Sequence, residues 1–182
     1  MDRFALFSEC LLVGVWIAVA ALPLVTFPAA FAAGTRHLRR YLAGEHGGLR
    51  EFAGDVRTAV RGGWIVGAAV WAAAALLVLD LAAVRAGLPG GSFVGAVGIL
   101  ATIGLLVAVL RAASAWEPGA LWRTLLAEAG RTTVLDPAGS LLLVCGMAVV
   151  VLSGALVLPL AVPVLGAVAA AATAVRARRL SR

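Results

Sequence analysis

Few side chains in this 182-residue sequence could take part in catalysis, and their spacing matches no catalytic motif. The two histidines, His37 and His46, lie in a charged segment, and His46 directly follows Glu45. A zinc hydrolase needs further ligands at helical spacing, as in His-Glu-x-x-His, and a serine hydrolase needs a paired Ser and His. Neither histidine has such a partner in register. We therefore expect both histidines to be solvated and the protein not to be an enzyme.

The cysteines and glycines likewise give no sign of a cofactor. Cys10 and Cys145 are isolated within apolar runs and form no Cys-x-x-Cys pair, so we expect buried thiols and not metal ligands. The Gly-Gly pairs lack the lysine of a phosphate-binding loop, since the chain contains no lysine. The sequence thus predicts no catalytic residue, no metal site and no cofactor.

One acidic residue, Asp80, lies near the end of an apolar stretch. Acidic groups deep in a membrane are expensive and usually functional. Because Asp80 is close to the end of its run and to Arg85, we expect it to reach the membrane interface or to pair with that arginine.

Four long stretches without any charged residue explain why so few reactive groups are present. The protein is 63% hydrophobic and 13% charged, whereas soluble domains are nearer half apolar and a quarter charged. A run of about 18 or more apolar residues can cross the ~30 Å hydrocarbon core as a helix. The uncharged runs are Cys10–Thr35, Gly62–Leu79, Ala86–Leu110 and Pro137–Val175. They predict an all-α, polytopic transmembrane helix bundle that forms a single domain over residues 1–182.

Prolines and amphipathic patterns divide these runs into elements. Pro23 and Pro28 predict a break, after which Thr26 caps a second helix of about 27–42 that leaves the membrane. Pro159 and Pro163 predict a reversal within the last run, which is too long for one span. These four prolines are candidate functional helix breaks. The predicted spans are 7–26, 62–81, 92–110, 138–157 and 160–175, and the predicted interfacial amphipathic helices are 49–61 and 117–134.

The arginines predict how the bundle is oriented. The net charge is +6, but a basic face outside the membrane flanks is absent, so we expect no nucleic-acid partner. Thirteen of the 15 arginines lie in two loops and the C-terminal tail, which belong on the cytoplasmic side. Five spans with the N-terminus outside and the C-terminus inside satisfy this rule. Four spans would place the tail outside, and a re-entrant final segment would also keep it inside.

The passage after the first span carries a family resemblance. Residues 22–34 read LPLVTFPAAFAAG, which resembles the LPxVTxxPA passage of the YesL family of bacterial integral membrane proteins. The positions that carry the resemblance are Leu22, Pro23, Val25, Thr26, Pro28 and Ala29, although Pro28 and Ala29 follow Thr26 one residue sooner than in that passage. Gly44-Glu45-His46-Gly47 and the aromatic-bearing segment 52–61 are also similar to that family, whereas the C-terminal half matches in hydropathy alone.

This resemblance implies a role without assigning a reaction. The YesL family is largely uncharacterised and is associated with carbohydrate uptake, including sugar ABC transporters. It therefore implies an accessory protein of carbohydrate uptake in the bacterial plasma membrane, with the lipid bilayer and sugar ABC-transporter components as partners. A small-solute transporter or permease subunit is the alternative, because transporters often use broken helices.

Overall fold

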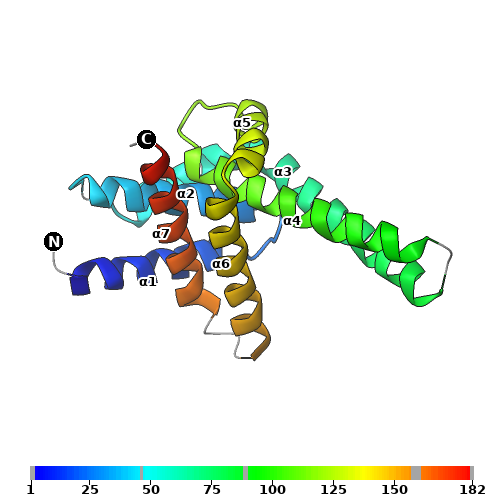
Figure 1. Ribbon diagram of the computed structural model, residues 1–182. Helices are drawn as coiled ribbons and strands as arrows, with labels where there is room; N and C mark the ends of the chain where they lie inside the picture. The colour runs from blue at the N-terminus through cyan, green and yellow to red at the C-terminus, as the bar shows by residue number, and fades with distance from the viewer. Residues whose placement is uncertain (1–2, 46, 88–89, 157–160, 181–182) are drawn as a thin grey trace.

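The described part of the chain is entirely helical. The computed structural model describes all residues except 1–2, 46, 88–89, 157–160 and 181–182 (Figure 1). Seven helices and no strand occur in these residues, which confirms the all-α prediction. They are α1 Arg3–Ala20, α2 Phe27–Leu42, α3 Leu49–Arg85, α4 Gly91–Ala115, α5 Trp122–Leu135, α6 Pro137–Leu156 and α7 Ala161–Leu180.

Helix α2 forms the centre of the bundle. It contacts α1, α3, α4 and α7, and its residues 28–35 are all buried. The small side chains of Ala29, Ala30, Ala32 and Ala33 let the surrounding helices approach closely. The predicted range 27–42 agrees with the structure, and the first half of α2 lies in the core of the bundle.

Helix α3 is one continuous helix of 37 residues. The sequence predicts an interfacial helix 49–61 followed by a separate span 62–81, whereas the structure has no break between them. Trp122 of α5 packs over the Gly62-Gly63 pair within this helix. A Cβ atom at Gly62 would lie 2.8 Å from Trp122 Cδ1, and one at Gly63 would lie 3.2 Å from Trp122 Cζ2. The two glycines therefore provide space for the indole ring.

Helix α5 also begins later than predicted. The range 117–134 placed Glu117 and Pro118 in its first turn, whereas the helix starts at Trp122. Gly119 has a φ of +88°, a left-handed conformation that a right-handed helix cannot include. The helix therefore starts after this residue. Glu117 is thereby left in the connection between α4 and α5.

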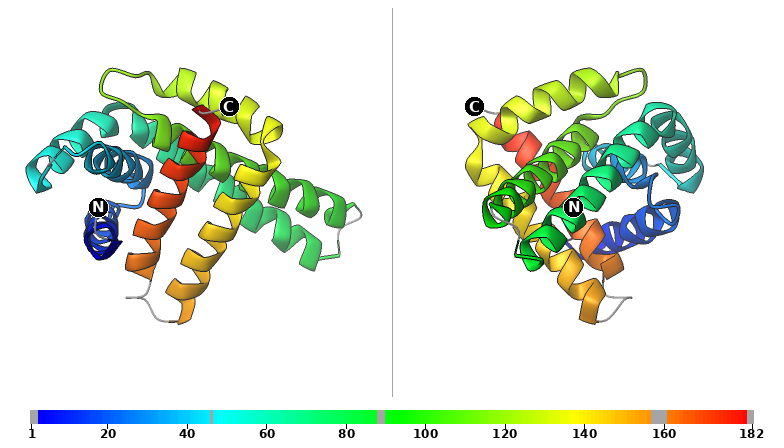
Figure 2. Two further views of the ribbon diagram at one scale, coloured as in Figure 1. Left: turned by 60° about the vertical axis from the view of Figure 1, so that its left-hand side comes forward. Right: turned by 90° about the vertical axis from the view of Figure 1, so that its right-hand side faces the viewer.

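The antiparallel pair α3–α4 extends beyond the other helices (Figure 1). Figure 2 shows that α6 and α7 form a second antiparallel pair, which lies across the α3–α4 pair. The projecting part of α3–α4 exposes large apolar side chains, including Leu76, Phe93 and Leu100. Only 11% of the most apolar stretch of α3 and 22% of that of α4 is buried. These surfaces are compatible with contact to lipid.

Two of the described helices, α3 and α4, are long and apolar enough to cross a membrane. A third span results if α5 and α6, which meet at a bend of 104°, are counted together, and Phe7–Ala20 forms a shorter apolar helix. The chain therefore has the composition and helix lengths of a membrane protein. The predicted total of five spans remains a prediction.

Candidate functional site

The C-terminal end of α4 is surrounded by arginines from other helices. The carbonyl oxygen of Ser114 accepts hydrogen bonds from Arg39 of α2 and from Arg176 of α7, the latter at 2.9 Å. Arg39 also donates to the carbonyl oxygen of Trp116 at 2.9 Å. The last carbonyls of a helix lack intrahelical partners and carry the negative end of its dipole. Arginines from α2 and α7 thus cap α4.

Acidic residues complete this cluster. Asp55 of α3 pairs with Arg36, and Glu117 accepts hydrogen bonds from Arg36 Nε at 3.3 Å and from Arg39 Nη2 at 2.6 Å. Asp55 is buried although its side chain is acidic. Its burial is possible because Arg36 neutralises it. We call Arg36, Arg39, Asp55, Glu117 and Arg176 the α4 cap cluster.

The pKa directions of its arginines reflect these surroundings. Burial lowers the pKa of Arg39, and the nearby positive charge of Arg176 acts in the same direction, whereas Glu117 opposes both. Burial also acts to lower the pKa of Arg36, but its hydrogen bonds and charge interactions with Asp55 and Glu117 outweigh this effect and raise it. The carboxylates therefore offset much of the cost of holding several cations together.

A second ion pair joins α4 to the start of α6. Arg111 Nη2 lies 2.9 Å from Asp136 Oδ2, and it also donates to Asp136 O at 3.1 Å and to Ser140 Oγ at 3.2 Å. Asp136 accepts a hydrogen bond from the backbone N–H of Gly139 at 3.0 Å. Asp136 thus caps the N-terminus of α6, whose first residue is Pro137.

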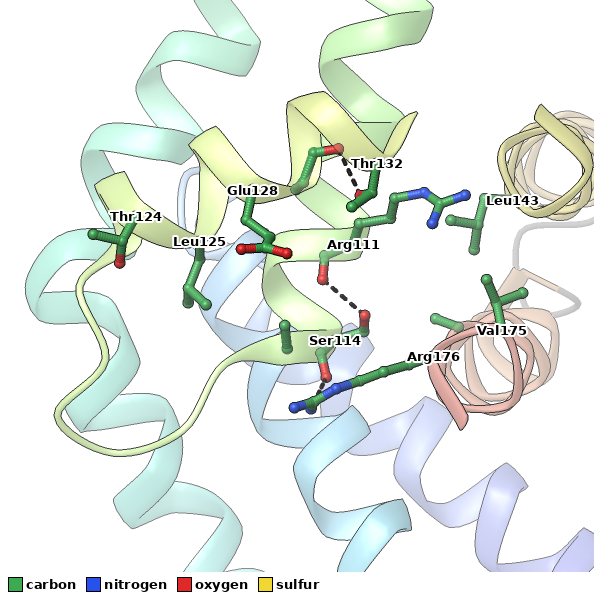
Figure 3. A pocket seen from close by; sticks show the side chains of 12 residues that line it. Arg111, Ser114, Thr124, Leu125, Glu128, Thr132, Leu143, Val175 and Arg176 are labelled. Atoms are coloured by element: carbon green, nitrogen blue, oxygen red, sulfur yellow. Dashed lines mark hydrogen bonds between the residues drawn. The ribbon is translucent and has the colours of Figure 1, made fainter. Parts of the chain in front are cut away.

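Beside this pair lies a cavity of about 530 Å³ between α4, α5, α6 and α7. Its apolar lining includes Leu143 of α6, and its polar lining residues are Arg111, Ser114, Thr124, Glu128, Thr132 and Arg176. In Figure 3 the side chain of Arg111 extends toward Leu143, and that of Arg176 extends from α7 toward Ser114. We call this space, with its twelve lining residues, the Arg111 cavity.

His37, which the sequence predicts to be solvated, is buried instead. The His37 side chain is 4% exposed, its Nε2 lies 2.7 Å from Glu9 Oε1, and its ring packs edge-on against Trp16. Local sequence patterns could not predict this contact, because Glu9 is 28 positions away, on α1. His46 lies outside the described residues. Within the described range, no group of three His, Cys, Asp or Glu side chains is arranged to hold a metal.

The predicted helix breaks lie apart from both arginine sites. Pro23 occupies the turn between α1 and α2, Pro28 lies in the first turn of α2, and Pro163 lies in the first turn of α7. Pro159 is outside the described residues. Thr26 occupies the N-cap position of α2 as predicted, but its side chain makes no capping hydrogen bond, and its hydroxyl donates to the carbonyl oxygen of Ala20 at 2.6 Å.

Some of the six positions that resemble the YesL passage pack against other parts of the bundle at this turn. Pro28 and Ala29 are buried in the core, and the carbonyl oxygen of Val25 lies directly against Gly67 of α3. Leu22 is exposed. None of the six motif residues is among those that line the Arg111 cavity.

Of the two alternatives predicted for Asp80, a pair with Arg85 is absent among the described residues, and a position at the membrane interface remains a prediction. The carboxylate of Asp80 lies against Gly98 of α4, within the projecting α3–α4 pair. The absence of a side chain at Gly98 makes room for it. From the sequence, Arg111 and Arg176 are predicted only to be topology signals. The one sign of a role in a site is that each directly follows an apolar run.

Searches of protein-family models, of curated proteins and of solved structures found no match to this chain.

Proposed function

We propose that this chain is a non-enzymatic accessory protein of the bacterial plasma membrane that takes part in carbohydrate uptake. One observation carries the membrane part of the proposal. The fold separates an exposed apolar helix pair, α3–α4, from a charged end that contains the α4 cap cluster. Lipid covers the first surface, and the second remains available to water and to partner proteins.

The arginines support an orientation for this arrangement. The α4 cap cluster and the basic end of α7 belong together on the cytoplasmic side under the positive-inside rule. The turn between α3 and α4 then faces the opposite side, as does the N-terminus. In this orientation the charged end faces the compartment that contains the ATP-binding subunits of uptake transporters.

The sugar-uptake part of the proposal depends on the resemblance to the YesL family at residues 22–34 and 44–61. The structure adds a candidate docking surface at the start of α3, where Arg50, Arg57 and Thr58 are exposed. Polar side chains at this position suit a transient contact with a partner protein.

Site-specific photo-crosslinking in native membranes tests this role. A photoreactive residue at Arg57 should form adducts with a component of a sugar transporter, identified by mass spectrometry. The matched control carries the same residue at Leu100, an exposed position on the apolar part of α4, and should label lipid only. Adducts at Arg57 with lipid alone, together with unchanged sugar uptake after deletion of the gene, would contradict the proposal.

A permease subunit is the second candidate, and the break between α1 and α2 favours it. Leu24 has a φ of +55° at this break, and the chain there crosses α3 at Gly67. Transporters often place substrate sites at such discontinuous helices. Solute flux in proteoliposomes that contain the purified chain alone would favour this candidate over the accessory role.

A further inference from the structure

We propose that the Arg111 cavity binds the phosphate group of an anionic phospholipid. This site requires no partner protein and goes beyond an accessory role in uptake. Four observations support it: the position of the cavity, a buried Nε atom of Arg111 that has no hydrogen-bond partner among the described residues, an arginine without an ion pair to a described carboxylate, and a lining that is part polar and part apolar.

The first observation is the location of the cavity. It lies where the apolar helices α4, α6 and α7 meet the amphipathic helix α5. If the apolar helices cross the membrane, this junction is at the depth of the lipid headgroups. Basic pockets between helices at the cytoplasmic interface are known binding places for anionic headgroups.

The second observation concerns Arg111. Its side chain is only 9% exposed, and all of its hydrogen bonds to described residues come from Nη2. Its Nε is buried and has no hydrogen-bond partner there. A buried donor without a partner is costly. A small shift of the guanidinium toward a phosphate oxygen would supply the missing acceptor.

The third observation concerns the balance of charge. Arg176 donates to the carbonyl oxygen of Ser114 but forms no ion pair with a described carboxylate, and Arg39 lies close enough to repel it. Asp136 neutralises Arg111. The carboxylate of Glu128 also lines the cavity, but Glu128 is an exposed residue, so it lies at the rim while Arg111 lies on the floor.

These charges suit a phosphodiester with donors on its headgroup. The guanidinium groups of Arg111 and Arg176 can bind phosphate oxygens through charge-assisted hydrogen bonds. Glu128 at the rim can accept hydrogen bonds from headgroup hydroxyls, as phosphatidylglycerol provides. Asp136 and Glu128 balance Arg111 and Arg176 in number, so preference for this lipid would come from direct pairing of its phosphate with the guanidinium of Arg176 and not from a net charge of the cavity.

The fourth observation is the apolar part of the lining. Leu143 and Ala172 are buried side chains of α6 and α7, and Val175 and Leu125 are half-buried. A free sugar phosphate would gain nothing from contact with these side chains, whereas the glycerol backbone and first acyl carbons of a lipid would gain from it. The mixed lining therefore favours a lipid over a soluble phosphate.

Native mass spectrometry of the full-length, delipidated protein tests the site. Phosphatidylglycerol added to the detergent solution should be retained at least about tenfold better than phosphatidylcholine. Arg176→Gln should reduce this retention about tenfold, whereas the matched control Arg123→Gln should change it less than about twofold. Arg123 is an exposed arginine on α5 that does not line the cavity, so both variants lose the same charge.

A second variant keeps the charge and fills the space. Val175→Phe should also reduce retention of phosphatidylglycerol, and its thermal unfolding checks that the fold is retained. Equal retention of both lipids, or equal effects of Arg176→Gln and Arg123→Gln, would overturn the proposal. Binding of glycerol 3-phosphate or glucose 6-phosphate in place of the lipid would overturn the lipid assignment and favour a soluble organic phosphate.

Discussion

At the scale of single residues, the arginines of this protein do more than mark the side of the membrane. Arg39 and Arg176 reach from α2 and α7 to the same carbonyl oxygen at the end of α4. A helix end within a bundle must find donors for its last carbonyls. Arginine suits this task because its planar group presents several N–H donors on a long side chain.

Replacement of Arg39 by methionine should therefore destabilise the protein. Arg39→Met keeps most of the apolar contact but removes the donors to Ser114 O and Trp116 O. We expect a loss of about 1–2 kcal/mol in the free energy of unfolding, measured by denaturant unfolding in detergent. Arg123→Met, at an exposed position, should change it by no more than about 0.5 kcal/mol. Equal effects of the two variants would show that Arg39 has no capping role.

At the scale of elements, glycines set how closely the helices approach. The Gly63-xxx-Gly67 spacing places one glycine under Trp122 and the other against the backbone of Val25. A Cβ atom at Gly67 would overlap the carbonyl oxygen of Val25. Backbone atoms cannot rotate away as a flexible side chain can, so the turn between α1 and α2 requires glycine at this position.

An alanine scan of two glycines tests this requirement. Gly67→Ala should lower the free energy of unfolding by about 1–3 kcal/mol, because the turn must shift to admit the methyl group. Gly104→Ala is the control, since its Cβ would have no neighbouring atom within 4 Å. That variant should be neutral or more stable by up to about 1 kcal/mol, the helix-propensity difference. Similar thermal denaturation of both variants would contradict the proposed close contact.

At the scale of the whole molecule, apolar and charged surfaces lie apart. The α3–α4 pair projects beyond the other helices (Figure 1) and exposes apolar side chains such as Leu76, Phe93 and Leu100, whereas the α4 cap cluster and the end of α7 are charged. This separation agrees with a protein whose α3–α4 turn and C-terminus lie on opposite sides of the bilayer.

Reporter fusions test this topology. Fusions of alkaline phosphatase after Gly90 and after Leu158 should be active, because both positions are predicted to lie outside. Green fluorescent protein fused after Arg182 should fluoresce, because the C-terminus is predicted to be cytoplasmic. A cytoplasmic signal at Leu158 would refute the predicted pair of spans in the last apolar run.

The sequence alone determined the class of the protein and much of its helical pattern. Long uncharged runs require helices in a low-dielectric environment, since only a helix satisfies its own backbone hydrogen bonds there. Pro28 correctly indicated the start of α2 because its effect on the backbone is local. The packing of Gly62 and Gly63 could not be predicted, since it depends on an indole ring about 60 positions away.

Only the tertiary structure decided which polar groups meet. Arg39 and Ser114 lie 75 positions apart, Arg176 and Ser114 lie 62 apart, and His37 and Glu9 lie 28 apart. Hydropathy and spacing report the preferences of neighbours along the chain, whereas these contacts depend on the crossing of packed helices. The Arg111 cavity is likewise formed by four helices together. Its position could not be read from any one of them.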